Sequence, residues 1–414
     1  MLAVIGLTHK TASLDVRELV AVPEAEIPRL LEGVAAVPGV TEAVVLSTCN
    51  RTELYVTTMD HPPVDRLAAV LAGWGNIPVD AILPHLRAAS GEDAARHALR
   101  VAAGLESMVV GEAQVLGQLR RAFTAAREAG TAGPILNRLM QVAIGCGRRA
   151  RAETGLGRRA ASIPHAAMRR ARTVLGTLGD RRLAIVGAGE MAELVAKVFT
   201  HAEARLVAVA NRTAATAAAL AARYGAMGIG LDGLRDVVRD TEVLVVSIGA
   251  DDPVLIPEIL REAGPRSTPL LVIDIGVPRG VAPQVRALPD VILYDLDELQ
   301  PPGSADTSES DLAQANEIVE DALDAFMRWL GGRSAVPVIA ALHARAERII
   351  DEELHRARGR LSGLDEHQRR AVRGVIEGAV RKLLHAPFVR LRAQGEDARA
   401  LTLARTLFDL EDAP

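Results

Sequence analysis

The sequence predicts an α/β protein of several domains, and changes of pattern along the chain indicate where they lie. At 414 residues the chain is too long for one ordinary hydrophobic core, so two or three domains are expected. Residues 1–145 mix short strand-like runs with helices, and residues 162–300 alternate strand and helix. Residues 301–414 turn to helical spacing. We therefore expect an α+β domain, a doubly wound parallel domain and an all-α domain, in that order.

The first part contains strand-like runs at 5–7, 44–46 and 54–56, and helical spacing at 27–37 and 94–103. The polar segment Ser47–Thr52 separates two of the strand-like runs and predicts a tight turn. The turn carries Cys49 beside Arg51, which would favour the nucleophilic thiolate. A small buried side chain is the competing explanation for a cysteine, and the polar neighbours leave both open. Cys146, in a helix-like apolar stretch, is predicted to be structural.

Composition narrows the class of protein. The chain is 49% apolar and 24% charged, which is typical of soluble globular proteins. Two cysteines form no disulfide framework and suit a reducing cytoplasm. No secretory signal and no apolar run long enough to span a bilayer is found. The net charge of −4 does not indicate a nucleic-acid binder. We expect a soluble, cytoplasmic protein.

Basic residues are concentrated between residues 145 and 182. Only Glu153 and Asp180 oppose the arginines of this segment, which are Arg148, Arg149, Arg151, Arg158, Arg159, Arg169, Arg170, Arg172, Arg181 and Arg182. A solvated helix face is the usual explanation for such a run, and contact with a phosphate backbone is the alternative, because guanidinium groups suit phosphate oxygens. The two explanations stay open. We treat residues 146–161 as a basic linker.

The second part carries a nucleotide-binding signature. A short apolar run at 183–186 leads into a glycine-containing loop and then an apolar-periodic helix, as in Rossmann-like domains. The expected cofactor-binding residues of this loop are Gly187, Ala188, Gly189, Glu190, Met191 and Ala192. After the next strand, Asn211 and Arg212 stand where an acidic ribose ligand would favour NAD, so we expect NADP. The histidines and cysteines show no metal-site spacing.

Two further segments complete the pattern. Residues 104–118 place Glu112 near Gln114 and Gln118, which lie on one face if the segment is helical and could orient a polar substrate or face solvent. His97 lies on a small-residue helix, where a structural role is the usual one. The third part follows a breaker-rich hinge at 300–304, and its long amphipathic helices, interrupted near 331–332 and Pro337, predict a dimer interface.

Several motifs together resemble glutamyl-tRNA reductase. The resemblance is carried by the segment at 47–53, the stretch 104–118, the loop 187–192 and Asn211-Arg212-Thr213. It is also carried by residues 6–12, 274–279 and 384–387, so it covers nearly the entire chain. It implies an N-terminal catalytic domain, an NADP-binding domain and a dimerisation domain with a long spinal helix. The family is a V-shaped homodimer.

The resemblance also implies a reaction. The family uses NADPH to reduce glutamyl-tRNA to glutamate-1-semialdehyde with release of tRNA, the first step of tetrapyrrole (5-aminolevulinate, porphyrin and haem) biosynthesis. Cys49 matches the nucleophile that forms an enzyme thioester, and His97 matches a histidine needed for activity. An aminomutase that takes the aldehyde is an implied partner. The implied substrate-binding residues are Thr48, Asn50, Arg51, Ser107, Glu112, Gln114 and Gln118.

Some positions depart from the family pattern. Residues 247–252 differ from the small, Ser/Thr-rich sequence usual there, and Pro164 with the basic flank 158–172 is unusual. Two other functions remain as alternatives. An inactive, tRNA-binding regulatory homologue would be expected to lack Cys49 or the glycine loop, and both are present. An NADP-dependent dehydrogenase of a small free acid would leave Cys49 unexplained.

Overall fold

The computed structural model describes residues 1–112, 114–156, 162–249, 252–266, 268–299, 308–393 and 398–410. The chain divides into two compact units, Met1–Glu320 and Asp321–Pro414. The first unit contains the α+β part and the parallel sheet, and the second is helical.

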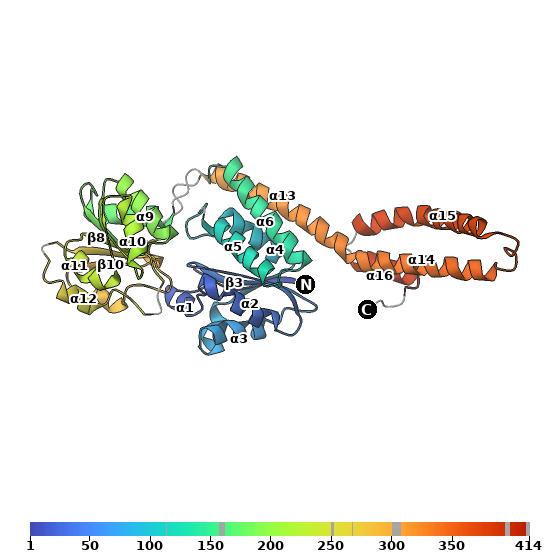
Figure 1. Cartoon of the computed structure of the whole chain (residues 1–414), viewed down its shortest axis with the longest axis horizontal. Coiled ribbons are helices and arrows are strands. Elements are labelled where there is room, and N and C mark those ends of the chain that lie inside the picture. Colours follow the sequence, from blue (N-terminus) through green and yellow to red (C-terminus); the bar gives the residue numbers. More distant parts are fainter. Residues whose placement is uncertain are drawn as a thin grey trace. The chain divides into compact units, whose positions relative to one another are not determined.

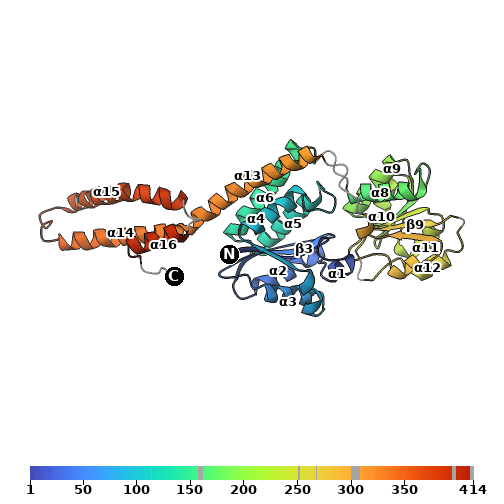
Figure 2. The ribbon, with the colours of Figure 1, turned by 180° about the vertical axis from the view of Figure 1, so that it is seen from behind.

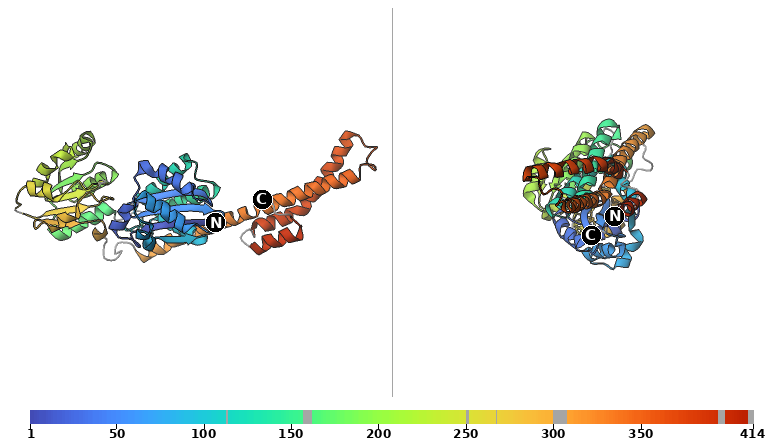
Figure 3. Two further views of the ribbon diagram at one scale, coloured as in Figure 1. Left: turned by 90° about the horizontal axis from the view of Figure 1, so that it is seen from below. Right: turned by 90° about the vertical axis from the view of Figure 1, so that its right-hand side faces the viewer.

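The α+β part of the first unit is built on a four-stranded antiparallel sheet with strand order β2-β3-β1-β4, and its strands are the blue arrows seen from below in the left view of Figure 3. Helices α2 and α3 lie on one side of this sheet, and α4 and α6 lie on the other (Figures 1 and 2). Both predicted helices and all three predicted strands of this part are present. Its elements are β1 (Leu2–Thr8), α1 (Leu14–Leu19), α2 (Ile27–Ala35), β2 (Val40–Thr48), β3 (Arg51–Thr58), α3 (Val64–Trp74), β4 (Arg87–Ser90), α4 (Glu92–Ala103), α5 (Gln114–Glu128) and α6 (Pro134–Glu153).

Helices α4 and α6 cross at very close range. Gly147 of α6 is buried, and a Cβ atom at this position would lie 2.3 Å from the carbonyl oxygen of Ala102 in α4. Only a residue without a side chain allows this approach. The neighbouring Cys146 is 2% exposed, which agrees with a structural role. Helix α6 continues to Glu153, so the first half of the predicted linker 146–161 is helical rather than a connection.

The second half of the first unit is a doubly wound domain, as predicted. Its six strands are all parallel and follow the order β10-β9-β8-β5-β6-β7. The chain therefore adds β6 and β7 on one side of β5 and then returns to add β8, β9 and β10 on the other side. Its strands are β5 (Arg182–Val186), β6 (Arg205–Ala210), β7 (Met227–Ile229), β8 (Val243–Val246), β9 (Leu270–Asp274) and β10 (Val291–Tyr294). Its helices are α8 (Ile163–Leu175), α9 (Glu190–His201), α10 (Ala214–Ala222), α11 (Leu234–Arg239) and α12 (Pro257–Glu262), with a short 3-10 turn η6 (Asp297–Leu299) after β10.

Long helices make up the rest of the chain. They are α13 (Glu309–Ser334), which crosses the boundary between the units, α14 (Val336–Arg356), α15 (Glu366–Ala393) and α16 (Ala398–Leu407). The predicted interruption at 331–332 is wrong, because α13 runs through both glycines and the break comes at Ala335. Pro337 then occupies the first turn of α14, where its missing N–H costs nothing. The predicted hinge at 300–304 lies outside the described residues.

The second unit exposes large apolar side chains on its helices. Val375 and Leu383 of α15 are 73% and 75% exposed, while Leu384 and Phe388 of the same helix lie in the core that α15 forms with α14 and α16. Such an uncovered apolar face is typical of an assembly surface. Among the described residues, no single helix is long and apolar enough to cross a membrane.

Candidate functional site

The predicted turn around Cys49 is present and firmly held. Thr48 and Arg51 pair across the ends of β2 and β3, and they leave Cys49 and Asn50 as the two turn residues. The side-chain oxygen of Thr48 accepts a hydrogen bond from the backbone N–H of Asn50 at 3.1 Å. The backbone carbonyl of Asn50 accepts a bond from the N–H of His9 at 2.8 Å, just after β1. The ends of the neighbouring strands β2, β3 and β1 therefore fix the position of Cys49, which is half-buried.

The expected effect of Arg51 on Cys49 is outweighed by burial. Burial raises the pKa of the Cys49 thiol to about 12, the Glu112 carboxylate raises it further, and Arg17 and Arg51 only lower it in part. Arg51 is itself 2% exposed and already paired, since it donates to Glu53 at 2.9 Å and to the carbonyl of Glu106. Arg51 thus lowers the pKa of the Cys49 thiol, the predicted direction, but burial outweighs this effect.

Glu53 lies at the centre of a buried network. Its carboxylate accepts hydrogen bonds from Arg51, from the Tyr55 hydroxyl at 2.7 Å and from the His97 ring at 2.8 Å. Burial raises the pKa of Glu53, but the Arg51 charge and the His97 and Tyr55 contacts outweigh it and hold the pKa at about 2. Because strand side chains alternate, Arg51, Glu53 and Tyr55 share the face of β3 that looks toward α4. His97 thus reaches Arg51 through a charged carboxylate.

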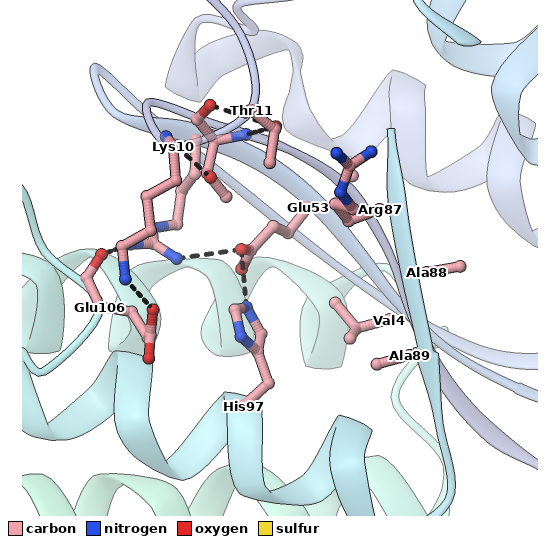
Figure 4. A pocket seen from close by; sticks show the side chains of 12 residues that line it. Val4, Lys10, Thr11, Glu53, Arg87, Ala88, Ala89, His97 and Glu106 are labelled. Carbon is pink, nitrogen blue, oxygen red and sulfur yellow. Dashed lines mark hydrogen bonds and ion pairs between the residues drawn. The ribbon is translucent and has the colours of Figure 1, made fainter. Parts of the chain in front are cut away.

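A pocket of about 220 Å³ opens beside this network (Figure 4). Its lining carries opposite charges, with Lys10 and Glu106 paired across its rim. Cys49 is not among the lining residues, so His97 and Cys49 are parts of neighbouring rather than shared surfaces. The lining comprises Val4, Gly6, Thr8, Lys10, Thr11, Arg51, Glu53, Arg87, Ala88, Ala89, His97 and Glu106.

The segment after α4 supplies the other predicted substrate-binding residues. Ser107 and Glu112 are buried, and burial raises the pKa of the Glu112 carboxyl to about 7. Gln114 begins α5 and reaches the glycine loop, where its amide nitrogen lies 3.5 Å from the sulfur of Met191. Gln118, one turn further on, lines a different pocket together with Ser47. The structure therefore brings Glu112 and Gln114 toward Cys49 but does not place Gln118 with them.

Buried polar atoms without partners mark the site independently of the predictions. In the described part of the chain these side-chain atoms are His9 Nδ1, Arg17 Nε and Nη1, Asn50 Oδ1, Gln114 Oε1 and Arg151 Nε. Asn50 and Gln114 were predicted from the resemblance, whereas His9 and Arg17 were missed. A buried polar atom without a partner costs about 1–3 kcal/mol, so a group of them indicates a place for a polar ligand.

The glycine loop has the geometry of a dinucleotide site. Gly187 has φ +117°, and a Cβ atom there would lie 2.6 Å from the hydroxyl of Ser247. At Gly189 nothing would lie within 4 Å of a Cβ atom, so the loop is open on that side to a close-approaching group. Glu190, Met191 and Ala192 form the first turn of α9, whose N-terminal N–H groups favour a phosphate. Ala188 is half-buried behind them.

The ribose end of the site also fits the predicted cofactor. Asn211 follows β6 directly and donates to the carbonyl of Thr213 at 3.3 Å. Arg212 beside it is exposed, and no carboxylate takes the position at the end of this strand. The residues present therefore suit a dinucleotide whose ribose carries a phosphate.

The nucleotide loop and the cysteine turn pack against one hydrophobic cluster within the first unit. Cys49 packs against the hydrophobic cluster of the parallel-sheet domain, together with Ala188 and Met191 of the loop. Helix α1 joins the two domains with ion pairs, Arg17 to Asp297 at 2.5 Å and Glu18 to Arg279 at 3.0 Å. The turn that carries Cys49 and the glycine loop thus meet at the same cluster.

The described arginines of the basic run do not form one surface. Arg151 is turned inward, where it donates to the carbonyl of Glu112 at 2.7 Å. Arg170 donates to the carbonyl of Glu298 and lies over the ring of Tyr294. Arg148 and Arg149 are exposed. Arg158 and Arg159 lie outside the described residues.

Comparison with known proteins identifies the family. Residues 5–154 match the family model "Glutamyl-tRNAGlu reductase, N-terminal domain", residues 169–301 match "Shikimate / quinate 5-dehydrogenase", and residues 314–410 match "Glutamyl-tRNAGlu reductase, dimerisation domain". The chain is 36% identical to a glutamyl-tRNA reductase of Geobacter sulfurreducens, with 99% of this chain and 96% of the relative covered. It is 38% identical to one of Salinispora arenicola, with 99% and 92% covered.

Among solved structures, the chain is similar to a glutamyl-tRNA reductase from Methanopyrus kandleri, with 29% identity, a TM-score of 0.48 and coverage of 99% of this chain and 95% of that one. The sequence similarity to the curated relatives extends over nearly the whole length of both chains. The models for its first and last parts name the same enzyme. The chain therefore belongs to the glutamyl-tRNA reductase family.

Proposed function

We propose that the protein reduces glutamyl-tRNA to glutamate-1-semialdehyde with NADPH and releases tRNA, as the first step of tetrapyrrole synthesis. The observation that carries the proposal is that Cys49 and the glycine-loop residues Ala188 and Met191 pack against the same hydrophobic cluster of the nucleotide domain. A thiol alone would serve an acyl transfer, and a nucleotide loop alone would serve a dehydrogenase of a free acid. Their packing on one cluster favours a reaction that needs both an acyl-enzyme and a reducing cofactor.

In the proposed mechanism Cys49 attacks the ester carbonyl of the glutamyl group and forms a thioester as the tRNA leaves. When bound, NADPH supplies the reducing equivalents for the acyl carbon. The high pKa of the thiol means that the closed site must supply positive charge to the sulfur at the moment of attack. Glu112, with a pKa of about 7, can donate or accept a hydrogen bond near neutral pH, which suits a contact with the polar substrate.

The remaining roles divide between the two surfaces. Thr48, Asn50, Ser107 and Gln114 surround the cysteine turn or the segment facing it, and we assign them to the glutamyl group. Gln118 keeps this assignment only as an indirect contact, since it lines another pocket. Arg51 and His97 act through Glu53, so we assign His97 to positioning Arg51 rather than to proton transfer.

The partners follow from the same reaction. Glutamate-charged tRNA is the substrate, and the exposed apolar residues of α15 suit a homodimer formed by the helical domain. The unstable aldehyde gives a reason for transfer to an aminomutase. We further propose a cytoplasmic location, NADPH rather than NADH, and domains at 1–145, 162–300 and 301–414.

The test uses glutamate-charged tRNA and NADPH with the wild-type protein and Cys49→Ser. We expect aldehyde formation by the wild type and none by the variant, while Cys146→Ser, at the buried structural cysteine, keeps activity. Without NADPH the wild type should accumulate a glutamyl thioester at Cys49. Equal reduction of free glutamate, or full activity of Cys49→Ser, would show that the proposed function is wrong.

A further inference from the structure

Arg17 is a buried cation whose hydrogen-bonding capacity is only partly used. Its side chain is 2% exposed, and one terminal nitrogen donates to Asp297 at 2.5 Å. The nitrogen atoms Nε and Nη1 are buried and have no partner in the described structure. Guanidinium groups inside proteins normally satisfy most of their five N–H donors. Two free donor atoms on one buried cation therefore indicate that an anionic or polar group binds there.

The position of Arg17 connects these free donors to the cysteine turn. Arg17 and Leu14 are the two buried residues of α1 and lie three positions apart, so they share one face of the helix. Leu14 belongs to the hydrophobic cluster against which Cys49 packs. The charge of Arg17 acts directly on Cys49, and among the groups that lower the pKa of the thiol it precedes Arg51. The third charged group facing the sulfur, Glu112, acts in the opposite direction.

Arg51 cannot take this role as easily, because its donors are committed. It bonds to the buried Glu53 carboxylate and to the carbonyl of Glu106. A guanidinium paired with a fully buried carboxylate exerts a weaker field on a third group, since the carboxylate cancels much of its charge. Arg17 also has a carboxylate partner, Asp297, but that partner comes from the nucleotide domain.

We propose that Arg17 is a further catalytic residue of the reaction proposed above, one that stabilises the negative charge that develops on the Cys49 sulfur and on the carbonyl oxygen it attacks. The sulfur donates an electron pair to the acyl carbon and forms the C–S bond, while the carbonyl π pair moves to oxygen. When that pair re-forms the carbonyl, the C–O bond to the tRNA ribose breaks. The thiol proton is transferred to the released hydroxyl group.

Asp297 has two effects on α1. It lies in the turn after β10 and accepts hydrogen bonds from two groups of the helix, the Arg17 side chain and the backbone N–H of Leu14. Asp297 therefore holds α1 against the nucleotide domain and also neutralises part of the positive charge of Arg17. A neutral side chain at position 297 should leave Arg17 with at least as strong an influence on the sulfur.

The test measures alkylation of Cys49 by iodoacetamide as a function of pH, with the modified peptide identified by mass spectrometry. The variants are Arg17→Gln, Arg17→Lys, Asp297→Asn and Arg279→Gln. Arg279 is the matched control, because it ties α1 to the nucleotide domain through Glu18 without belonging to the site. We expect Arg17→Gln to slow alkylation about tenfold near neutral pH, corresponding to a rise of about one pH unit in the pKa of the thiol.

The other variants separate charge from structure. Arg17→Lys, which keeps the charge, should lie between Arg17→Gln and the wild type, and Arg279→Gln should match the wild type. Asp297→Asn, which removes the opposing charge, should leave alkylation as fast or faster. The inference is overturned if Arg17→Gln alkylates like the wild type, or if Arg279→Gln and Asp297→Asn slow alkylation as much as it does. If Arg17→Gln fails to fold, slower alkylation in Asp297→Asn overturns it.

A second readout addresses acyl transfer. In a single turnover with glutamyl-tRNA and no NADPH, Arg17→Gln should form the Cys49 thioester more slowly than its alkylation rate alone would predict, because the oxyanion also loses its donor. An equal slowing in both reactions would limit Arg17 to the thiolate and contradict the oxyanion role. If the wild type forms no thioester while alkylation still depends on Arg17, the proposed function fails and the role of Arg17 at the sulfur stands.

Discussion

Replacing Glu53 by glutamine tests whether the buried network beneath the cysteine turn stabilises the N-terminal domain. Its carboxylate is 2% exposed and accepts bonds from three side chains, one of them the cation Arg51. Its pKa of about 2 in the folded protein, against an ordinary 4.5, corresponds to about 3 kcal/mol of stabilisation. Removing one partner of a buried ion pair typically costs about 3–5 kcal/mol. We therefore expect Glu53→Gln to lower the free energy of unfolding by about 3 kcal/mol or more.

The pH dependence has a defined sign. Because the folded-state pKa of Glu53 is depressed, its stabilisation is fully present above about pH 4.5 and is lost as the pH falls toward about 2. The wild type should lose stability over this range, and Glu53→Gln should lack this part of the acid dependence.

The assay is urea unfolding followed by tryptophan fluorescence. The chain has two tryptophans, Trp74 in the N-terminal domain and Trp329 in α13. In a Trp329→Phe background, Trp74 reports on the domain that contains Glu53. The control is Glu153→Gln, which breaks an exposed pair with Arg149 and should cost less than about 0.5 kcal/mol. A loss below about 1 kcal/mol for Glu53→Gln, or an unchanged acid dependence, would refute the reasoning.

Three further predictions concern the nucleotide domain and the basic run. Gly187→Ala should destabilise the domain, because its Cβ meets Ser247, whereas Gly189→Ala should fold normally and bind NADPH at least tenfold more weakly. Thermal melts measure the first effect and NADPH titration measures the second. Normal NADPH binding by Gly189→Ala would exclude close approach of the cofactor at this position. Arg212→Gln should weaken NADPH binding about tenfold and leave NADH binding unchanged, and an equal effect on both would remove Arg212 from the 2′-phosphate. Replacing Arg148 and Arg149 by glutamine should reduce the salt dependence of tRNA binding, and an unchanged slope would assign these exposed side chains to solvent.

Local pattern was sufficient to predict the main features of the fold. A polar segment between two strand-like runs gave the Cys49 turn, and an apolar run ending in glycines gave the strand–loop–helix of the nucleotide domain. Both depend on contacts between residues close in sequence. The pairing of Arg51 with Glu53 also had a local signal that was overlooked, since a strand places residues two apart on one face.

The parts of the site that escaped prediction depend on distant contacts. Arg17 meets Asp297, which is 280 residues away in the sequence, and no periodicity relates the two. Arg151 was grouped with the arginines that could contact phosphate, yet the packing of α6 turns it toward Glu112. In both cases the charge was visible in the sequence, but its direction was set by how helices pack.

The close crossing of α4 and α6 has a consequence for how the protein can vary. His97 projects from one of these helices and Arg151 from the other, so their spacing is set where Gly147 meets Ala102. The relative position of these two side chains thus depends on the lack of a Cβ atom at Gly147. A single added carbon at position 147 would move one helix against the other and shift both side chains, although neither it nor its neighbours take part in the chemistry. Substitutions at position 147 are therefore expected to lower activity as much as changes in the cysteine turn do.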